Sequence, residues 1–445
     1  MQKSEGKVAS PGSLMADSNN MIAQMTLTGH IAAVWSDARA ALAEMPRASR
    51  WFHIFWLLGP LILLIERSPA DAWLTICAVT FAARAVLRRE GNWLKVFWVR
   101  AVFAFWGVCL LSAALSEMPT YSLGEAFIWI RFPLFAMATC FWLATDKRLL
   151  FAMIGMTVLG MSLMTGILIA EVLIVGHNTG RLSWPYGDLV PGYYLSKACL
   201  PVLCLLVSLY VKEKLPNSAW IALVLTFVVS ATLLTGERIN ALIVVCASIL
   251  SFLVSKPKIQ KLIASVFSLV FPLLLLAYMT PQILYRFGSN FFTELPFDGQ
   301  SAYLRVWRGA LELYWSSPFI GIGPDNYRNL CVESGVGLSK IDCHTHPHQF
   351  YLQILVETGL LGLVLGSIMI FAIIAKSFTL FSKNLDDVIL RVAFIPSLAV
   401  FFPLQSTADF FGQWHNVFMW TGLALTLSFP NVLRESPNEI RDEVT

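Results

Sequence analysis

The stretch from Gln349 to Ala375 reads QFYLQILVETGLLGLVLGSIMIFAIIA and contains a single ionisable residue, Glu357. A helix needs about 20 predominantly apolar residues to cross a bilayer, so this stretch is long enough for one crossing. Similar runs recur on both sides of it, at 52–65, 71–87, 96–115, 123–144, 149–175, 191–211, 218–235, 239–255, 262–280, 392–408 and 414–430. The sequence therefore predicts an all-α, polytopic membrane protein with about 12 transmembrane helices.

The composition leads to the same class of protein. Of the 445 residues, 57% are hydrophobic and only 13% are charged, whereas an ordinary soluble domain carries roughly 25% charged residues. This balance excludes a water-soluble enzyme, a collagen, a coiled coil, a disordered chain and a disulfide scaffold. The net charge of +4 is too small to indicate a nucleic-acid partner, so the partners we expect include membrane lipids and no nucleic acid.

The placement of the basic residues predicts the orientation. Lysines and arginines recur in alternate short loops and in the N-terminal arm: Arg47, Arg50, Arg84, Arg88, Arg89, Lys95, Lys147, Arg148, Lys212, Lys214, Lys256, Lys258, Lys261, Lys376, Lys383 and Arg391. By the positive-inside rule these loops and both termini face the cytoplasm. Segments 176–190, 236–238, 281–348 and 409–413 are then outside.

The spans also define the predicted segments of the chain. These are an N-terminal cytoplasmic arm (1–50), helices 1–9 (51–280), one large outer loop (281–348), helices 10–12 (349–430) and a cytoplasmic tail (431–445). The first fifty residues hold no apolar core and so are not a signal peptide. Within them, 29–47 has two open readings, an amphipathic helix lying against the membrane or a poorly ordered polar tail.

The large outer loop is expected to have structure of its own, because connections of this length are usually functional. Its middle predicts a helix over 302–316, with Ser301 as N-cap and Pro318 after its end. Two of the eight cysteines, Cys331 and Cys343, fall in this loop. Because an extracytoplasmic compartment is oxidising, we hypothesise a Cys331–Cys343 disulfide that contributes roughly 2–3 kcal/mol.

Histidines gather at the end of the loop, where residues 343–349 read CHTHPHQ. In an extended segment His344, His346 and His348 point to one side, which suits zinc, but Pro347 and the start of a helix interrupt such a strand. Solvated loop histidines account for one or two of the three. His348 is different because it stands at the mouth of the tenth span. With an ordinary pKa near 6.5, histidine suits general-base chemistry at neutral pH.

The tenth span carries a face of small residues and a buried acid. Gly359, Gly362 and Gly366 share one face, and the last two form a Gly-x-x-x-Gly pair that allows close helix packing. An acid inside a span is costly, so Glu357 is expected to have a structural or functional partner. Arg131, inside the fourth span, is the candidate partner.

The outer side carries arginines and almost no lysine, since only Lys340 accompanies Arg181, Arg238, Arg286, Arg305, Arg308 and Arg328. Arginine makes planar, bidentate contacts to phosphate that lysine cannot make. Arg238 lies in a very short connection. There it either snorkels to lipid head groups or pairs with Glu237, or it clamps a diphosphate. There is no Asp-x-Asp motif and no phosphate-binding glycine loop, which argues against a metal-dependent nucleotide-sugar enzyme. No cofactor is expected.

These residues resemble a known family. His348-Gln349, followed after nine residues by Gly359-Leu-Leu-Gly362, resembles the His-[Asn/Ser/Gln]…Gly-x-x-Gly signature of bacterial O-antigen ligases, with Leu363 where that family often has Thr or Trp. The wider stretch Arg305…Trp307…Ser317-Pro-Phe-Ile-Gly321-Ile-Gly323 is similar to the domain shared by O-antigen ligases and polymerases. So is Thr235-Gly-Glu-Arg238, where the family commonly shows Ser-Arg. The resemblance covers roughly residues 220–375.

The resemblance implies a metal-independent, inverting glycosyltransferase in the bacterial inner membrane. It would move a glycan from undecaprenyl diphosphate to a lipid A-core or other glycan acceptor, with 281–348 as the periplasmic catalytic loop. His348 would deprotonate the acceptor hydroxyl. Arg238 and Arg305 would bind the donor diphosphate, with Arg308 as a third choice. His346, Arg181 and Glu357 are secondary candidates, and His346 would orient rather than catalyse.

Other functions stay open at this point. A polymerase of O-antigen or another exported polysaccharide would use the same lipid-linked donor, and a ligase acting on protein is a further alternative. A transporter would predict internal repeats and polar groups in the middle of the membrane. The sequence shows no convincing repeat, and its ionisable residues gather at the outer face instead.

Overall fold

The computed structural model describes residues 27–176, 180–187, 191–213, 218–263, 288, 301–333, 343–383 and 386–433, and the regular secondary structure within them is helical. The N-terminal half holds α2 (Leu27–Ala43), α3 (Arg47–Leu57), α4 (Gly59–Ile62), α5 (Arg67–Arg88), η1 (Asn92–Lys95), α6 (Phe97–Ala114), α7 (Pro119–Trp129), α8 (Arg131–Ala138), η2 (Thr139–Leu143), α9 (Lys147–Ile174), α10 (Pro191–Tyr193), η3 (Tyr194–Ala198) and α11 (Leu200–Lys212). The remainder holds α12 (Ser218–Leu234), α13 (Arg238–Val254), α17 (Ala302–Tyr314), α18 (Tyr327–Glu333), α19 (Phe350–Lys383), η4 (Leu390–Val392), α20 (Phe394–Val400), α21 (Gln413–Ser428) and η5 (Phe429–Leu433).

Several of these helices are long and apolar enough to cross a membrane. They are α5, α6, the run Pro119–Leu143, α9 and α19, and a sixth span arises if the bent pair Pro191–Ala198 and Leu200–Lys212 is taken as one. Shorter apolar helices cover Ala222–Leu234, Arg238–Val254 and Leu390–Val400. The predicted class, a polytopic all-α membrane protein, is therefore confirmed. The number of 12 spans stays a prediction.

Most predicted spans coincide with a helix, and two need comment. The ninth, at 262–280, lies almost entirely outside the described residues. The eleventh, predicted at 392–408, is helical only as far as Val400. Segment 401–412 runs as a loop instead, because Pro403 cannot continue a helix. Its polar side chains Gln405 and Asp409 are buried in contacts with other elements.

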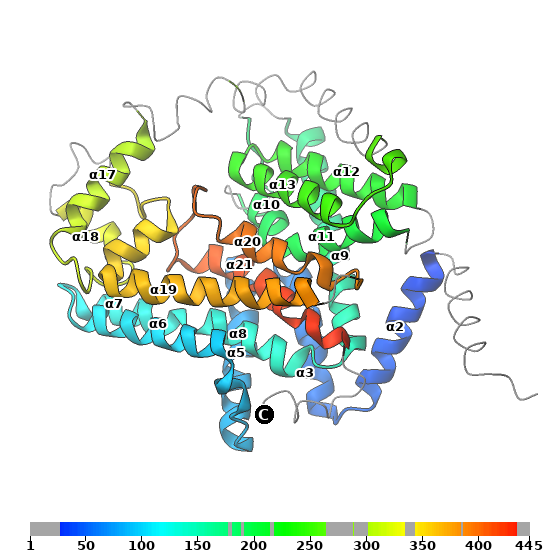
Figure 1. Cartoon of the computed structure of the whole chain (residues 1–445), viewed down its shortest axis with the longest axis horizontal. Helices are drawn as coiled ribbons and strands as arrows, with labels where there is room; N and C mark the ends of the chain where they lie inside the picture. Colours follow the sequence, from blue (N-terminus) through cyan, green and yellow to red (C-terminus); the bar gives the residue numbers. More distant parts are fainter. Residues whose placement is uncertain are drawn as a thin grey trace, which may run out of the picture.

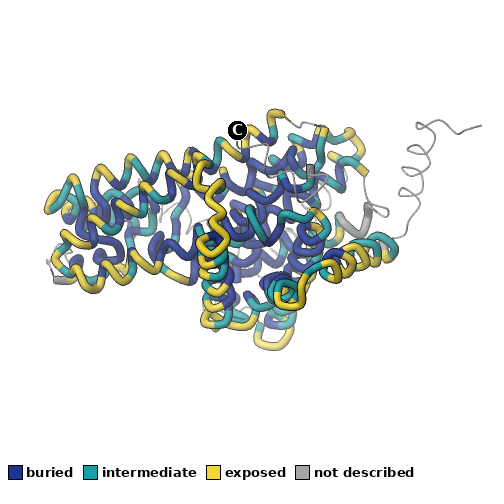
Figure 2. Tube along the Cα trace, turned by 90° about the horizontal axis from the view of Figure 1, so that it is seen from below, coloured by how far each residue is buried: buried dark blue, intermediate teal, exposed yellow. Residues whose placement is uncertain are grey.

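The long helix α19 lies beside α6, and together they form one side of the molecule in Figure 1. Helices α5, α8 and α21 pack behind them, and α12 and α13 lie on the opposite edge. Buried residues concentrate where these helices meet, while exposed residues follow their outer faces (Figure 2). In this core Trp129 stacks on Phe410, and the Phe105 ring meets both of them edge-on. The helices that carry the outer loop are thus held by a continuous apolar core.

The structure decides between the two readings of 29–47. Leu27–Ala43 forms the helix α2, which packs against α9. Ala38 and Ala41 are buried, and a Cβ atom added at Gly155 of α9 would lie 3.9 Å from the Trp35 ring. The polar-tail reading is therefore wrong for this helix, whose apolar face is partly covered by α9 while Ile31 stays exposed.

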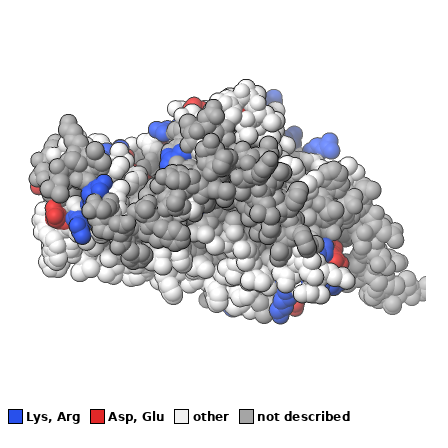
Figure 3. Space-filling model, turned by 90° about the horizontal axis from the view of Figure 1, so that it is seen from above, with Lys and Arg blue, Asp and Glu red and all other residues white. Residues whose placement is uncertain are grey.

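Loops that the sequence assigns to one side of the membrane contact one another. At one end, Arg148 pairs with Glu44 at 2.8 Å, joining the loop after η2 to the N-terminal arm. At the other end, the Ser122 hydroxyl donates to the Pro324 carbonyl over 2.8 Å. Charged side chains are scattered in small groups over the face shown in Figure 3, separated by uncharged or undescribed surface. Which end faces the cytoplasm stays a prediction.

Candidate functional site

The glycine-rich turn 318–323 docks against a break in α19. At Gly359 the backbone leaves the helical region, with φ +68° and ψ −171°. The amides of Leu360 and Leu361, after the break, donate to the carbonyls of Pro318 and Phe319 over 2.9 and 3.2 Å. Before the break, the Val356 and Glu357 carbonyls accept from Ile322 and Gly323 over 3.1 and 2.8 Å. The turn therefore satisfies the backbone groups that the broken helix leaves unpaired.

Two glycines make this docking possible. A Cβ atom at Gly359 would lie 2.3 Å from the Phe319 carbonyl carbon, and one at Gly321 would lie 2.4 Å from that of Glu357. Both positions also have positive φ, which glycine adopts without strain. The predicted glycine face is therefore correct only in part. Gly366 does let α19 approach Phe105 of α6, but Gly359 serves the break rather than helix packing.

Glu357 anchors the loop and does not pair with Arg131. Its fully buried carboxylate accepts from the amides of Asp325 (3.0 Å) and Tyr327 (3.2 Å) and from the Gln353 side chain (3.3 Å). Arg131 pairs instead with Asp71 of α5 at 2.8 Å. The suggested Arg131–Glu357 pair is wrong because the acid points to the start of α18, where free amides favour a negative charge.

A second buried network extends from this point. The Arg328 guanidinium contacts Asp325 at 2.7 Å and Asp409, in the loop 401–412, at 2.5 Å. The other Asp409 oxygen accepts from the Gln353 side chain over 2.7 Å. Burial and the nearby Asp409 raise the pKa of Asp325 to about 7. Sequence reasoning missed both aspartates, because nothing in their local pattern indicates a partner so distant along the chain.

His348 lies at the centre of the candidate site. Its backbone is left-handed, with φ +57°, a conformation that is uncommon outside glycine and often marks functional sites. The His348 carbonyl accepts from the Thr407 amide over 2.9 Å. Its ring centroid lies 4.2 Å from that of His346 and 5.2 Å from that of His344. In the part of the chain that the structure describes, no group of three or more His, Cys, Asp or Glu could hold a metal ion.

The pKa of His348 is lowered, which favours the unprotonated ring that a general base requires. Burial, helped by the neighbouring His346 and His344, lowers the pKa of His348 to about 3. Burial also lowers the pKa of His346. At neutral pH the His348 ring is therefore uncharged and can accept a proton.

Helix α17 is present where the sequence predicts it and lies against the histidine segment. The Trp307 indole donates to the Pro347 carbonyl over 3.1 Å, and the Tyr303 ring lies 5.8 Å from the His348 ring. Arg305 is two positions from each, about 200° around the helix axis, and so leaves α17 on a different face. Arg308 is exposed. Tyr303 and Trp307 are thus two residues of α17 that contact the histidine segment.

Arg238 and Arg181 are brought close to each other by their loops. The Leu182 amide donates to the Thr235 carbonyl over 3.3 Å, and a Cβ atom at Gly236 would lie 1.9 Å from the Gly180 carbonyl oxygen. Arg238 is half-buried and is the first residue of α13, whereas Arg181 is exposed. Glu237 accepts from the Asn240 side chain over 2.5 Å. The two arginines therefore stand together at one rim of the molecule, on the side that the sequence predicts to be outside.

Aromatic rings connect this rim to His348. A Cβ atom at Gly192 would meet the Glu237 carboxylate, which places α10 against the start of α13. The adjacent Tyr193 ring lies 4.9 Å from the ring of His415 on α21, and His415 lies 5.3 Å from Phe350. Phe350 is two residues beyond His348. Arg238 and His348 thus lie on either side of the Tyr193–His415 contact.

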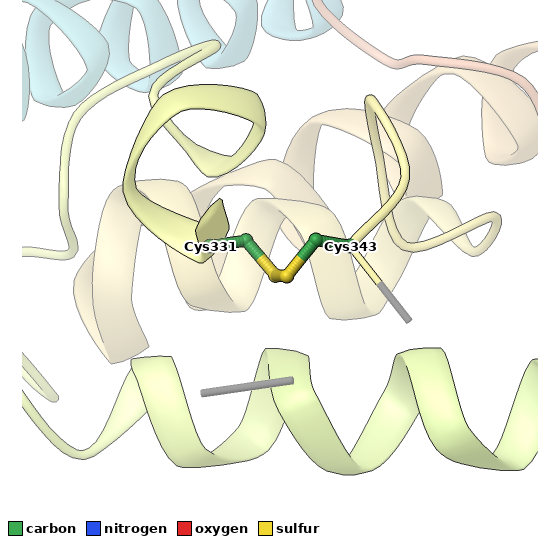
Figure 4. Close-up of a disulfide and its surroundings, with 2 residues drawn as sticks. All are labelled: Cys331 and Cys343. Atoms are coloured by element: carbon green, nitrogen blue, oxygen red, sulfur yellow. A yellow bond between two sulfur atoms is a disulfide. The ribbon is translucent and has the colours of Figure 1, made fainter. Parts of the chain in front are cut away.

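A disulfide fixes the segment that leads to the histidines. Cys331 and Cys343 are bonded, with their Cα atoms 5.6 Å apart. Figure 4 shows the bond joining α18 to the loop that precedes α19. Cys331 is fully buried in a small apolar cluster with Tyr327 and Leu313. Since α18 is also held by Glu357, the histidine segment is tied to α19 at both ends.

The comparisons with known proteins identify one part of the chain. Residues 218–367 match the model of the family described as O-antigen ligase. The resemblance seen in the sequence over roughly 220–375 is thereby confirmed. No curated protein matches the chain.

Proposed function

We propose that this protein, whose residues 218–367 match the O-antigen ligase family, transfers a glycan from undecaprenyl diphosphate to a lipid A-core acceptor on the periplasmic side of the inner membrane. One observation carries the proposal. The matched segment includes Arg238, Arg305, His348 and Gly359, the residues on which the resemblance rests.

In this reaction His348 acts as the general base. An unprotonated ring nitrogen takes the proton of the acceptor hydroxyl, and the hydroxyl oxygen attacks the anomeric carbon of the donor sugar. The bond from that carbon to the diphosphate oxygen breaks as the new glycosidic bond forms, so the anomeric configuration inverts. The low pKa of His348 keeps its ring uncharged before the acceptor arrives.

Arginines stabilise the leaving diphosphate in place of a metal. Arg238 and Arg305 are the proposed contacts, with Arg308 as a third, because a guanidinium offers paired donors to phosphate oxygens. Arg181 is a further candidate since its loop adjoins that of Arg238. His346 contacts the His348 ring and would orient it. Glu357 holds the start of α18 in place by accepting hydrogen bonds from the Asp325 and Tyr327 amides.

The test is glycan transfer by purified variants with a lipid-linked donor. His348→Ala and Arg305→Ala are each expected to abolish transfer while the protein still folds and inserts. Two matched controls, His30→Ala and Arg39→Ala, remove a histidine and an exposed arginine of α2 and are expected to retain transfer. Wild-type transfer by His348→Ala or by Arg305→Ala would remove that residue from the proposed site. Chelators are expected to leave transfer unchanged; inhibition by EDTA that zinc reverses would favour the three-histidine metal reading.

A second candidate function is an O-antigen or exopolysaccharide polymerase, since the resemblance covers the domain that both classes share. The lipopolysaccharide banding of a deletion strain separates them. A ligase predicts loss of all long chains with accumulation of undecaprenyl-linked polymer, whereas a polymerase predicts acceptors capped by a single repeat.

A further inference from the structure

A buried lysine lies near the candidate site and belongs to none of the residues discussed so far. Lys197 is only 3% exposed, and its ammonium contacts the Gln405 side-chain oxygen at 3.3 Å. Among the described residues, no carboxylate forms an ion pair with it. A buried charge whose partner is a neutral amide destabilises the empty protein. A buried lysine of this kind is expected to bind a ligand.

Lys197 also lies at an interruption of a predicted span. Helices α10 and η3 meet α11 at an angle of 58°, and η3 itself is a π-helix. Helix α11, 13 residues long, begins three residues after Lys197. The N-terminus of a helix carries a partial positive charge, and half-helices inside membranes commonly direct that end at anionic ligands. The lysine and the helix end therefore favour the same kind of ligand.

Hydrogen bonds connect the segment around Lys197 to the helix that begins at Arg238 on one side and to the loop that contacts His348 on the other. On one side, the neighbouring Ser196 hydroxyl donates over 2.8 Å to the side chain of Asn240, which is two residues after Arg238 on α13. On the other side, Gln405 belongs to the same loop as Thr407, whose amide bonds to the His348 carbonyl. Lys197 thus bridges the elements that carry Arg238 and His348.

Several polar atoms in this part of the molecule are buried and unpaired. His415 is 6% exposed, and neither of its ring nitrogens has a hydrogen-bond partner. The hydroxyl of Thr407 and Nε2 of His346 are likewise buried without a partner. His415 interacts electrostatically with both Lys197 and His346, so His415 lies between these two side chains or close to both. Buried polar groups are normally hydrogen-bonded, and a cluster of unpaired ones indicates a polar ligand.

We propose that Lys197 and His415 form the inner end of the donor site and bind the diphosphate of a polyprenyl-linked substrate. This inference rests on the proposed function, which it deepens by adding two residues to the donor site. The ligand is an anion because the binding groups are an ammonium, an imidazole and a helix N-terminus. A lipid-linked diphosphate is favoured over a free one because Lys197 lies within an interrupted membrane span, which a lipid-anchored ligand reaches from the bilayer.

The test is binding of undecaprenyl diphosphate to the full-length protein in lipid nanodiscs. Lys197→Met and His415→Leu each keep side-chain bulk and remove the polar atoms. Each is expected to weaken binding by about 10–100-fold, the usual cost of losing a hydrogen bond to a charged group. Lys212→Met, at the far end of α11, is the matched control and is expected to bind like the wild type. In transfer assays the two variants should raise KM for the donor and leave KM for the acceptor unchanged.

Folding provides a second measurement. Because both substitutions remove polar groups that the empty protein leaves buried and unsatisfied, the thermal unfolding midpoint is expected to stay level or to rise. Loss of donor binding by a variant of unchanged or higher stability is the result that a purely structural role does not produce. If one variant fails to fold, the other decides.

The outcomes separate the inference from the function on which it rests. If the wild type binds undecaprenyl diphosphate and both folded variants bind it equally well, the role of Lys197 and His415 is overturned while the proposed function stands. If the wild type binds no undecaprenyl diphosphate, the proposed function fails. If inorganic diphosphate competes at the same concentration as the lipid, the site takes a free anion and the lipid-linked assignment is overturned.

Discussion

The chemistry proposed for His348 depends on two features of its surroundings. Its left-handed backbone, held by the bond from the Thr407 amide, fixes the ring at the mouth of α19. Burial among His344 and His346 lowers its pKa to about 3, so that the ring is neutral. A sequence motif identifies the residue type and its position. It does not reveal the neighbours that set the proton affinity, because Thr407 comes from a loop that the sequence predicts to be part of a helix.

The first prediction concerns the pH profile. With the pKa of free His348 lowered to about 3, the ring stays unprotonated as the pH falls well below the ordinary histidine value of about 6.5. We therefore expect kcat/KM, which reports the free enzyme, to show no loss through titration of His348 between about pH 8 and pH 5. The measurement is the rate of glycan transfer at low substrate concentration across this range.

Asp325 needs a control in the same experiment, since burial and Asp409 raise its pKa to about 7. A decline near pH 7 that disappears in Asp325→Asn belongs to this aspartate. A decline near pH 6.5 that persists in Asp325→Asn would contradict the low pKa of His348.

At the scale of elements, the sequence predicts the helices well and their contacts poorly. Apolar runs and the N-cap at Ser301 locate both ends of α17 and the start of α19 to within about two residues, because burial in lipid or in the core demands such runs. The end of α19 was missed, since the helix continues from the predicted 375 to Lys383. The break at Gly359 was not predicted, since an apolar run gives no sign of a turn docking against it. The partners of Glu357 and Lys197 are equally hidden, because their contacts join residues far apart along the chain.

The second prediction concerns the disulfide, which ties α18 to the histidine segment. The double variant Cys331→Ser, Cys343→Ser is expected to loosen this connection and to lower the stability of the loop by roughly 2–3 kcal/mol. Hydrogen exchange should therefore increase in 327–333 and 343–348 and stay unchanged in α6 and α9, and transfer should decline. Cys246→Ser, which removes a cysteine outside the disulfide, is the control. Two free loop thiols in the protein isolated under non-reducing conditions would contradict the disulfide.

For the whole molecule, the scarce charges fall into two populations. Glu44, Arg148 and Asp146 lie together at one end, where the basic loops predict the cytoplasm. At the other end, the short loop between α6 and α7 meets the outer loop, since a Cβ atom at Gly323 would lie 2.7 Å from that of Ser116, and Ser122 of α7 bonds to Pro324. The grouping of loops was therefore predictable from charge alone. The networks of buried charge at Arg328 and Lys197 were not, because they depend on how the helices pack.

The third prediction is the orientation. Glu117 is exposed on the loop between α6 and α7, which contacts the outer loop. Arg88 is exposed at the end of α5, beside the basic residues Arg84 and Arg89. In a protein with Cys246→Ser, a membrane-impermeant maleimide added to spheroplasts is expected to label Glu117→Cys. Arg88→Cys should be labelled only after the membrane is permeabilised, because its loop carries the positive charge that stays inside. Since Glu117 lies at the same end as His348, labelling of Arg88→Cys alone in intact cells would place the histidines in the cytoplasm. That result would remove the proposed periplasmic transfer together with the topology.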